Sequence, residues 1–352
     1  MPFTKPSLRG GTMYFYIHFI TELVCFFLLS RYIQREIFVW LLFLTYDMLA
    51  FVPQALLGWF SDRHLKLPLG FSGLLMLAMA LIFNNCFTSP VPWLVILCLG
   101  NACIHVNGAE VTLRSAEGKL FPAGLFVSGG SFGLICGRLL AGTALPSLFL
   151  LIAIASALPL SLLAQRYLPK QTSPTAPTCG AFRYAKPELP AVAVLLPAVF
   201  VVAVRGYMAY GIPTAWIQTN LQVVLLYSAM GIGKAMGGLS ADLLGTKTTA
   251  LCSSLIALPF LLLGDQYMLI SLIGVLLFSM TMPVTLGLLV SILPSHPGLA
   301  FGLTTIGLFL GTLPMFFFRF TTTLANGILI AICTLLCAGA LQWIMKEDSF
   351  HA

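Results

Sequence analysis

Several polar and ionisable residues interrupt long apolar stretches of this sequence. His18 and Glu22 lie one helical turn apart, on one face of a predicted helix. An ionisable side chain in the middle of a bilayer costs at least about 2.5–3.5 kcal/mol, so such residues are retained for function or for pairing with one another. The predicted set for binding solute and protons is His18, Glu22, Asn101, His105, Arg205 and Lys234.

The residue types in this set indicate the chemistry that it can perform. Arg205 and Lys234 are cations that can bind a carboxylate or a phosphonate-like group. Glu22 can carry a proton, and histidines titrate near neutral pH and can share that role. We expect Glu22 to hold Arg205 when the site is empty, and an anionic solute to replace Glu22 when it gains a proton.

Structural interpretations of the same residues stay open. Glu22 and Arg205 can form an ion pair whose only role is to join two helices, and a buried pair is weak evidence for stability. A buried histidine is often just hydrogen-bonded to a neighbour, and Asn101 serves as well to bridge helices as to contact a solute.

The composition places these residues in a membrane protein. The chain has 352 residues, of which 59% are hydrophobic and 8% are charged. A membrane-spanning helix needs about 20 mostly apolar residues. In lipid the backbone N–H and C=O groups of such a segment must be hydrogen-bonded internally, which a helix achieves. Twelve spans are predicted, at residues 13–30, 37–60, 67–87, 91–113, 121–140, 146–166, 190–210, 215–240, 246–264, 267–292, 297–317 and 323–344.

The charged loops predict the orientation of these spans. Lysine and arginine concentrate on one side of the membrane, in the loops around Arg63, Lys119 and Lys170. This positive-inside bias puts both termini in the cytoplasm and the protein in the cytoplasmic (inner) membrane. The basic residues are spread over separate loops, which excludes a nucleic-acid partner. Eight of the nine cysteines lie inside spans without metal-ligand spacing, so we expect neither a metal nor a cofactor.

A loop motif occurs twice and divides the chain into halves. The stretch "GWFSDRHLK" (58–66) contains Gly58, Asp62, Arg63 and Lys66, and "GGLSADLLGTK" (237–247) repeats Gly238 and Asp242 after 180 residues. A Pro- and Thr-rich loop lies between the halves. We therefore predict a six-helix bundle at 1–166, a cytoplasmic linker at 167–189 and a second six-helix bundle at 190–352.

The loop at 58–66 resembles the motif G-x-x-x-D-R-x-G-[RK] of the major facilitator superfamily, with Leu65 in place of the second glycine. The stretches "HFITELVCFFLL" (18–29), "GNACIHVNGAEVTL" (100–113) and "AGLFVSGGSFGL" (123–134) are similar to the subgroup that contains fosmidomycin-resistance efflux proteins. The resemblance implies two pseudo-symmetric bundles of six helices, a cavity lined by the first, fourth and seventh spans, and a cytoplasmic gate at Gly58, Asp62, Arg63, Lys66, Gly238 and Asp242. The alternative interpretation is that Arg63 and Lys66 only anchor the loop on the cytoplasmic side of the membrane.

The glycines of the fifth span predict close helix packing. Gly129, Gly133 and Gly137 recur every fourth residue, which is a small-xxx-small pattern. The letters "GGSFG" (129–133) match the nucleophile elbow of hydrolases, but that motif needs a turn between a strand and a helix. They lie in a continuous apolar span, so we expect no enzyme.

These observations predict a secondary active transporter for a small organic solute, anionic or zwitterionic. We expect it to be coupled to protons, to act as a monomer by alternating access, and to favour efflux over uptake. A facilitated uniporter, or a transporter-like receptor or scaffold that does not transport, stays open as an alternative.

Overall fold

The computed structural model describes residues 5–65, 67–168, 179–318 and 323–348, and Lys66 of the predicted gate lies outside them. The described chain is helical. The helices of the first half are α1 (Lys5–Arg31), α2 (Val39–Phe51), α3 (Pro53–Ser61), α4 (Leu69–Asn84), α5 (Val91–Arg114), α6 (Phe121–Ala141) and α7 (Leu150–Ala164). Those of the second half are α8 (Ala191–Gly211), α9 (Asn220–Leu244), α10 (Thr246–Leu263), α11 (Met268–Ser279), α12 (Thr281–Ile292), α13 (Pro297–Thr312) and α14 (Thr323–Ile344).

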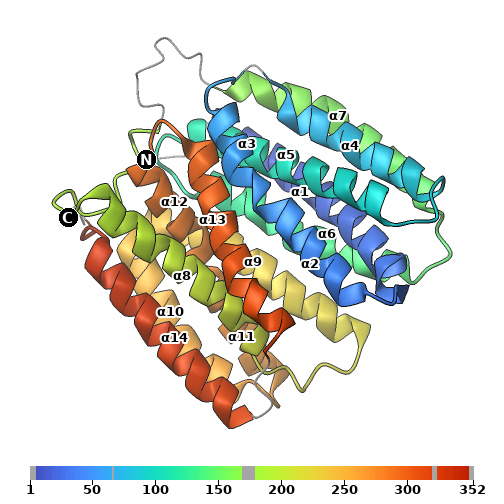
Figure 1. Ribbon diagram of the computed structural model, residues 1–352. Helices are drawn as coiled ribbons and strands as arrows, with labels where there is room; N and C mark the ends of the chain where they lie inside the picture. Colours follow the sequence, from blue (N-terminus) through green and yellow to red (C-terminus); the bar gives the residue numbers. More distant parts are fainter. Residues whose placement is uncertain (1–4, 66, 169–178, 319–322, 349–352) are drawn as a thin grey trace.

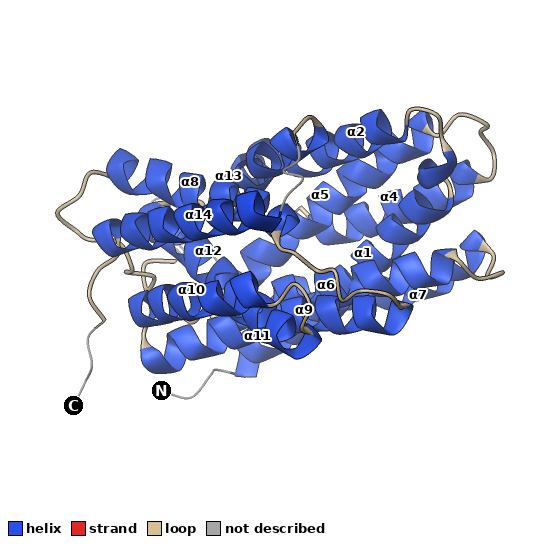
Figure 2. Ribbon diagram, turned by 90° about the horizontal axis from the view of Figure 1, so that it is seen from below, coloured by secondary structure: helices blue, strands red, loops and turns tan. Residues whose placement is uncertain are grey.

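These helices form twelve apolar segments. Within the described ranges, eleven helical segments are long and apolar enough to cross a membrane, and α4 is a shorter apolar helix at the predicted third span. The chain is therefore an integral membrane protein with the predicted all-helical architecture. Figure 1 shows the helices of the first half, in blue to green, grouped beside those of the second half, in yellow-green to red. Figure 2 shows the same helices running side by side from a second direction.

Two predicted spans are each interrupted near a proline. The span at 37–60 consists of α2 and α3, which meet at Val52 before Pro53, and the span at 267–292 consists of α11 and α12, which meet at Met280. Proline lacks an amide proton, and its ring clashes with the carbonyl of the preceding turn, so helices break or kink there.

Two helix starts differ most from the predicted span limits. α1 begins at Lys5, ahead of residue 13, because the polar residues that precede the apolar run continue the helix. α9 begins at Asn220, later than residue 215, because Thr219 and Gln222 form a reciprocal cap at that position. The predicted linker, 167–189, begins at the last residue of a helical turn (Gln165–Tyr167) and ends before α8 starts at Ala191.

Gly129, Gly133 and Gly137 lie where α6 touches α1. A Cβ at each position would overlap the carbonyl oxygen of Phe15, Phe19 or Leu23, respectively. The two helices therefore approach backbone to backbone, as the small-xxx-small pattern predicts.

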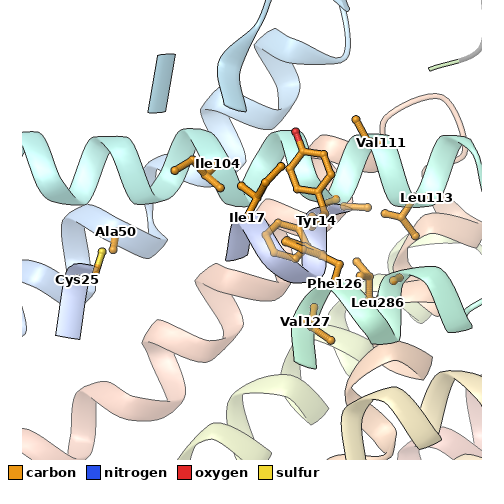
Figure 3. Close-up of a cluster of buried hydrophobic side chains, with 14 of the residues drawn as sticks. Tyr14, Ile17, Cys25, Ala50, Ile104, Val111, Leu113, Phe126, Val127 and Leu286 are labelled. Atoms are coloured by element: carbon orange, nitrogen blue, oxygen red, sulfur yellow. The ribbon is translucent and has the colours of Figure 1, made fainter. Parts of the chain in front are cut away.

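An apolar core fills the space beside this contact. Figure 3 shows Tyr14 of α1, Val111 and Leu113 of α5, Phe126 of α6 and Leu286 of α12 gathered in one cluster. All five are at most 3% exposed, and the rings of Tyr14 and Phe126 meet edge to face. Because Leu286 belongs to the second half, this core joins the two halves.

Candidate functional site

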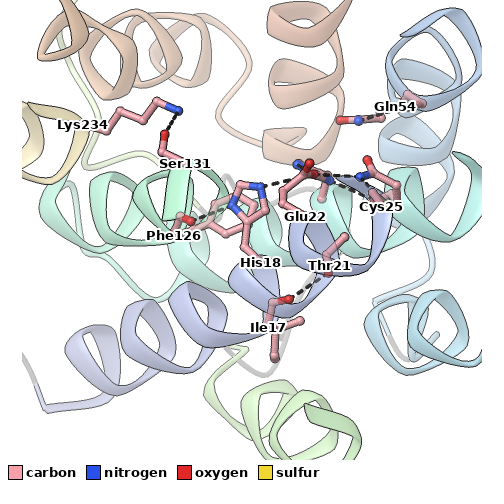
Figure 4. A network of polar contacts seen from close by, with 12 residues as sticks. Ile17, His18, Thr21, Glu22, Cys25, Gln54, Phe126, Ser131 and Lys234 are labelled. Carbon is pink, nitrogen blue, oxygen red and sulfur yellow. Dashed lines mark hydrogen bonds and ion pairs between the residues drawn. The ribbon is translucent and has the colours of Figure 1, made fainter. Parts of the chain in front are cut away.

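Four of the predicted polar residues meet between α1 and α5. Nε2 of His18 lies 3.8 Å from Oε1 of Glu22, and Nε2 of His105 lies 3.6 Å from the same oxygen. Asn101 donates from Nδ2 to Oε1 of Glu22 over 2.8 Å. We call His18, Glu22, Asn101 and His105 the central cluster; each is less than 10% exposed. Figure 4 shows His18 and Glu22 side by side on α1.

Backbone carbonyls fix both imidazole rings. Nδ1 of His18 lies 2.8 Å from the carbonyl oxygen of Phe126, and Nδ1 of His105 lies 3.0 Å from that of Asn101. A carbonyl oxygen only accepts hydrogen bonds, so each Nδ1 carries a proton and donates it. In the neutral rings, Nε2 is then an acceptor with its lone pair available beside Glu22. Gly130 leaves room for this arrangement, because a Cβ there would lie 2.5 Å from Nε2 of His18.

Asn101 joins three helices through its side chain. Its amide also donates to the Tyr46 hydroxyl of α2 at 3.3 Å and to the Cys25 sulfur of α1 at 3.5 Å. The structure therefore favours the bridging role of Asn101. Tyr46 was not among the predicted site residues, although a hydroxyl inside an apolar stretch is a signal that the sequence contains.

Lys234 lies at the margin of the central cluster. From α9 of the second half, its Nζ donates to Oγ of Ser131 on α6 over 2.9 Å, as Figure 4 shows. It lies close enough to Glu22 to interact with it electrostatically. Ser131, the serine of "GGSFG", sits in an uninterrupted helix and not at a nucleophile elbow.

Arg205 does not join the cluster, contrary to the predicted approach to Glu22. Its guanidinium donates to the carbonyl oxygen of Phe278 and lies 4.0 Å from the centre of that ring. Phe278 is in the last turn of α11, where the helix is about to break, and a carbonyl there is a ready acceptor. No ion pair between Glu22 and Arg205 occurs among the described residues.

Asp62 connects the two halves at the end of α3. It accepts hydrogen bonds from the amides of Gly298 (3.0 Å) and Leu299 (2.9 Å), in the first turn of α13. It also accepts one from Arg114 at 2.7 Å. Burial raises the pKa of Asp62, and the hydrogen bond from Leu299 and the charge of Arg114 oppose this rise. A carboxylate at a helix N-terminus is stabilised by the helix dipole.

Asp242 makes the matching contact in the second half. It accepts hydrogen bonds from the amides of Leu120 (2.8 Å) and Phe121 (2.9 Å), where α6 begins. Gly58 and Gly238 allow these approaches, because a Cβ at either position would overlap the backbone of Gly298 or Leu120. The two copies of the loop motif therefore make pseudo-symmetric contacts with the opposite half.

Near the Asp62 contact lie one exposed arginine, Arg63, and two buried charged residues, Glu110 and Arg114. Arg63 is exposed, and it stacks 3.9 Å from the ring centre of Trp59 and donates to the Trp59 carbonyl. This favours an anchoring role for Arg63. The buried partners Glu110 and Arg114 were absent from the predicted gate. Glu110 accepts a 2.5 Å hydrogen bond from Ser61, and the acid–base spacing of Glu110 and Arg114 on one helix face was the available signal.

The fold matches those of solved transporters. The fucose:proton symporter of E. coli superposes with a TM-score of 0.66 at 13% sequence identity, covering 98% of this chain and 99% of that one. A structure of the major facilitator superfamily transporter FucP in the outward conformation gives 0.63 at 14% identity, with 98% and 99% covered. The chain has the major facilitator fold.

A bacterial homologue of the iron transporter ferroportin, in its outward-facing state, also has this major facilitator fold. It superposes with a TM-score of 0.58 at 13% identity, covering 96% of this chain and 98% of that one. No protein-family model and no curated protein sequence matches the chain. The resemblance to the fosmidomycin-resistance subgroup therefore stays a prediction.

Proposed function

We propose that this chain is a secondary active transporter, not an enzyme, that works by alternating access in the cytoplasmic membrane with both termini in the cytoplasm. The observation that carries the proposal is the pair of contacts made by Asp62 and Asp242 with helix N-termini of the opposite half. A few hydrogen bonds can break and re-form as the two halves rock, which is what a cytoplasmic gate requires.

The solute in this proposal is small, organic and anionic or zwitterionic. Lys234 supports it, because it brings a positive charge to the region beside the central cluster, where its Nζ donates a hydrogen bond to Oγ of Ser131. Arg205 gives the anion less support than expected, since its guanidinium contacts Phe278. Export is the proposed direction and rests on the resemblance of residues 100–113 and 123–134 to efflux proteins.

Proton coupling is assigned to Glu22. Its carboxylate is buried between two histidine rings and is oriented by Asn101, so a proton gained or lost there changes the charge of the central cluster. A uniporter needs no such group, which makes Glu22 the residue that distinguishes the two mechanisms.

The test uses the purified chain in proteoliposomes with a panel of small organic anions, with and without a pH gradient. We expect a gradient to drive accumulation of at least one anion by the wild type. Glu22→Gln should still bind and exchange that solute but lose the response to the gradient. Glu36→Gln, which changes an exposed acid, is the matched control.

Two outcomes would contradict this proposal. If no solute in a broad panel moves through the wild type, the chain is a receptor or scaffold. If Glu22→Gln is still driven by the pH gradient, the proton is carried elsewhere.

A further inference from the structure

We propose that His18, Glu22 and His105 form a binding site for a divalent first-row transition-metal ion. The inference goes beyond the proposed function, and it does not depend on transport. One ligand atom from each residue, an imidazole nitrogen or a carboxylate oxygen, lies within 4.8 Å of the other two. They come from two helices and are buried, so they are not a chance grouping of flexible surface side chains.

The hydrogen-bond roles of these atoms carry the inference. Each Nδ1 donates to a backbone carbonyl, so each neutral ring presents the lone pair of Nε2 beside Glu22. The ionised carboxylate also presents lone pairs. Three acceptors therefore converge, and the hydrogen bond that Asn101 donates to Oε1 of Glu22 satisfies only the carboxylate. A cation in the space that the three share would interact favourably with all of them.

The distances distinguish a metal ion from a shared proton. The separations of 3.6 and 3.8 Å between the imidazole nitrogens and Glu22 exceed the range of about 2.7–3.2 Å for a hydrogen bond. A tetrahedral metal ion with bonds of about 2.0–2.2 Å holds its ligand atoms about 3.3–3.6 Å apart. Small movements of the side chains bring all three atoms to that geometry, whereas a proton on Glu22 can serve only one ring.

The surrounding groups resemble the outer shell of a metal site. Metal-binding histidines usually donate their second ring N–H to a carbonyl or carboxylate, as both do here. Asn101 contributes twice, because its backbone carbonyl orients His105 and its side chain orients Glu22.

The donor set selects the class of ion. Two imidazoles and one carboxylate suit Zn²⁺, Fe²⁺, Co²⁺ or Mn²⁺, whereas Ca²⁺ and Mg²⁺ prefer oxygen ligands alone. Three protein ligands leave a coordination position open for water or for a solute carboxylate. Lys234 is the charged residue that acts on this site from the second half, and its charge opposes a bound cation.

The test measures binding of Co²⁺ and Zn²⁺ to the purified, detergent-solubilised chain, without any transport assay. Visible absorption of Co²⁺ reports the ligand field, calorimetry gives the stoichiometry, and X-ray absorption of the Zn²⁺ complex reports imidazole ligands. We expect one ion per chain bound to two imidazoles, with no competition from Mg²⁺. His105→Asn and Glu22→Gln should each weaken binding at least tenfold, and Lys234→Met should strengthen it.

The control is His64→Asn, which removes an exposed histidine and should leave binding unchanged. The proposal is overturned if the wild type binds no stoichiometric Co²⁺ or Zn²⁺, or if the Zn²⁺ spectrum lacks two imidazoles. It is also overturned if folded His105→Asn binds as well as the wild type. If the ligand variants unfold, two measurements still test the proposal: the wild-type Zn²⁺ spectrum must show two imidazoles, and Lys234→Met must bind the ion more tightly than the wild type. If the chain binds the metal ion but transports no solute, this inference stands and the proposed function fails. If it transports a solute but binds no metal ion, the proposed function stands and this inference fails.

Discussion

At the scale of single residues, which polar residues interrupt the apolar spans was readable from the sequence, and the direction of each side chain was not. His18, Glu22, Asn101 and His105 were predicted as one set, and the structure brings them together. Arg205 was predicted with them, yet it contacts Phe278 on α11. α8 is apolar on all sides, so its sequence gives no sign of which face turns inward. The acceptor at the end of α11 arises from a helix break that spacing alone did not reveal.

Arg205→Lys tests whether Arg205 belongs to the solute site. Because its guanidinium contacts Phe278 and not the central cluster, we expect solute affinity to stay within a few fold of the wild type. Lysine can still donate one hydrogen bond to the carbonyl but loses the planar contact with the ring. Equilibrium binding of the transported anion is the measurement, with Lys234→Met as the comparison that should weaken it. A tenfold loss of affinity in Arg205→Lys alone would return Arg205 to the site.

At the scale of helices, small residues and helix ends account for the arrangement. Glycines at intervals of four predicted that α6 packs closely against another helix, because only the absence of a side chain lets two helix backbones meet. The partner helix was not predictable, since α1 carries no matching stripe that would identify it. Asp62 was among the predicted gate residues, but its contact with the first turn of α13 required the folded molecule.

Gly133→Ala should destabilise the protein by about 1–3 kcal/mol. The new methyl group would overlap the carbonyl of Phe19, so α6 and α1 must move apart along their shared face. Thermal unfolding in detergent measures the change. Gly142→Ala is the matched control, because the nearest atom to a Cβ at that helix end is 3.5 Å away. Equal unfolding temperatures for the two variants would show that the contact is not tightly packed.

Asp62→Asn should slow the transport cycle on the order of tenfold and leave solute affinity within a few fold. The amide side chain has one acceptor oxygen, so at least one charge-assisted hydrogen bond to α13 or to Arg114 is lost, worth about 1.5–3 kcal/mol. Asp242→Asn should have a smaller effect, because Asp242 accepts its hydrogen bonds from two backbone amides, whereas Asp62 also accepts one from Arg114.

Transport rates and binding affinities in proteoliposomes measure both changes. Exposed Arg63→Gln is the control and should behave as the wild type. If the Asp62→Asn variant folds but no longer binds solute, Asp62 belongs to the solute site and not to the gate.

At the scale of the whole molecule, the apolar segments predicted an all-helical, membrane-spanning chain. Span limits agree with the helices to within a few residues wherever a run of apolar residues ends in charged or turn-forming residues, as at Arg114 and Phe121. The conformational state was beyond sequence reasoning, because the same residues serve every state of a transporter. Here Asp62 and Asp242 hold the halves together at one end, the end that carries the linker.

Two native cysteines report on orientation and on opening of this end. Cys86 is exposed in the loop after α4, which is on the outer side if the N-terminus is cytoplasmic. Cys179 lies in the linker and is 3% exposed, with its amide donating to the carbonyl of Pro294. In variants that keep only one of them, a membrane-impermeant maleimide should label Cys86 from outside the cell. It should label Cys179 only from the cytoplasmic side, and slowly.

The rate at which maleimide labels Cys179 reports whether the gate contacts hold the two halves together. The linker touches both halves, since Ala181 packs against Gly118 of the first half and Cys179 bonds to Pro294 of the second. Separation of the halves must therefore uncover the Cys179 thiol. Adding Asp62→Asn should speed its labelling several fold, whereas Arg63→Gln should not change the rate. Labelling of Cys179 from outside would reverse the orientation, and an unchanged rate in Asp62→Asn would mean that Asp62 does not hold this end closed.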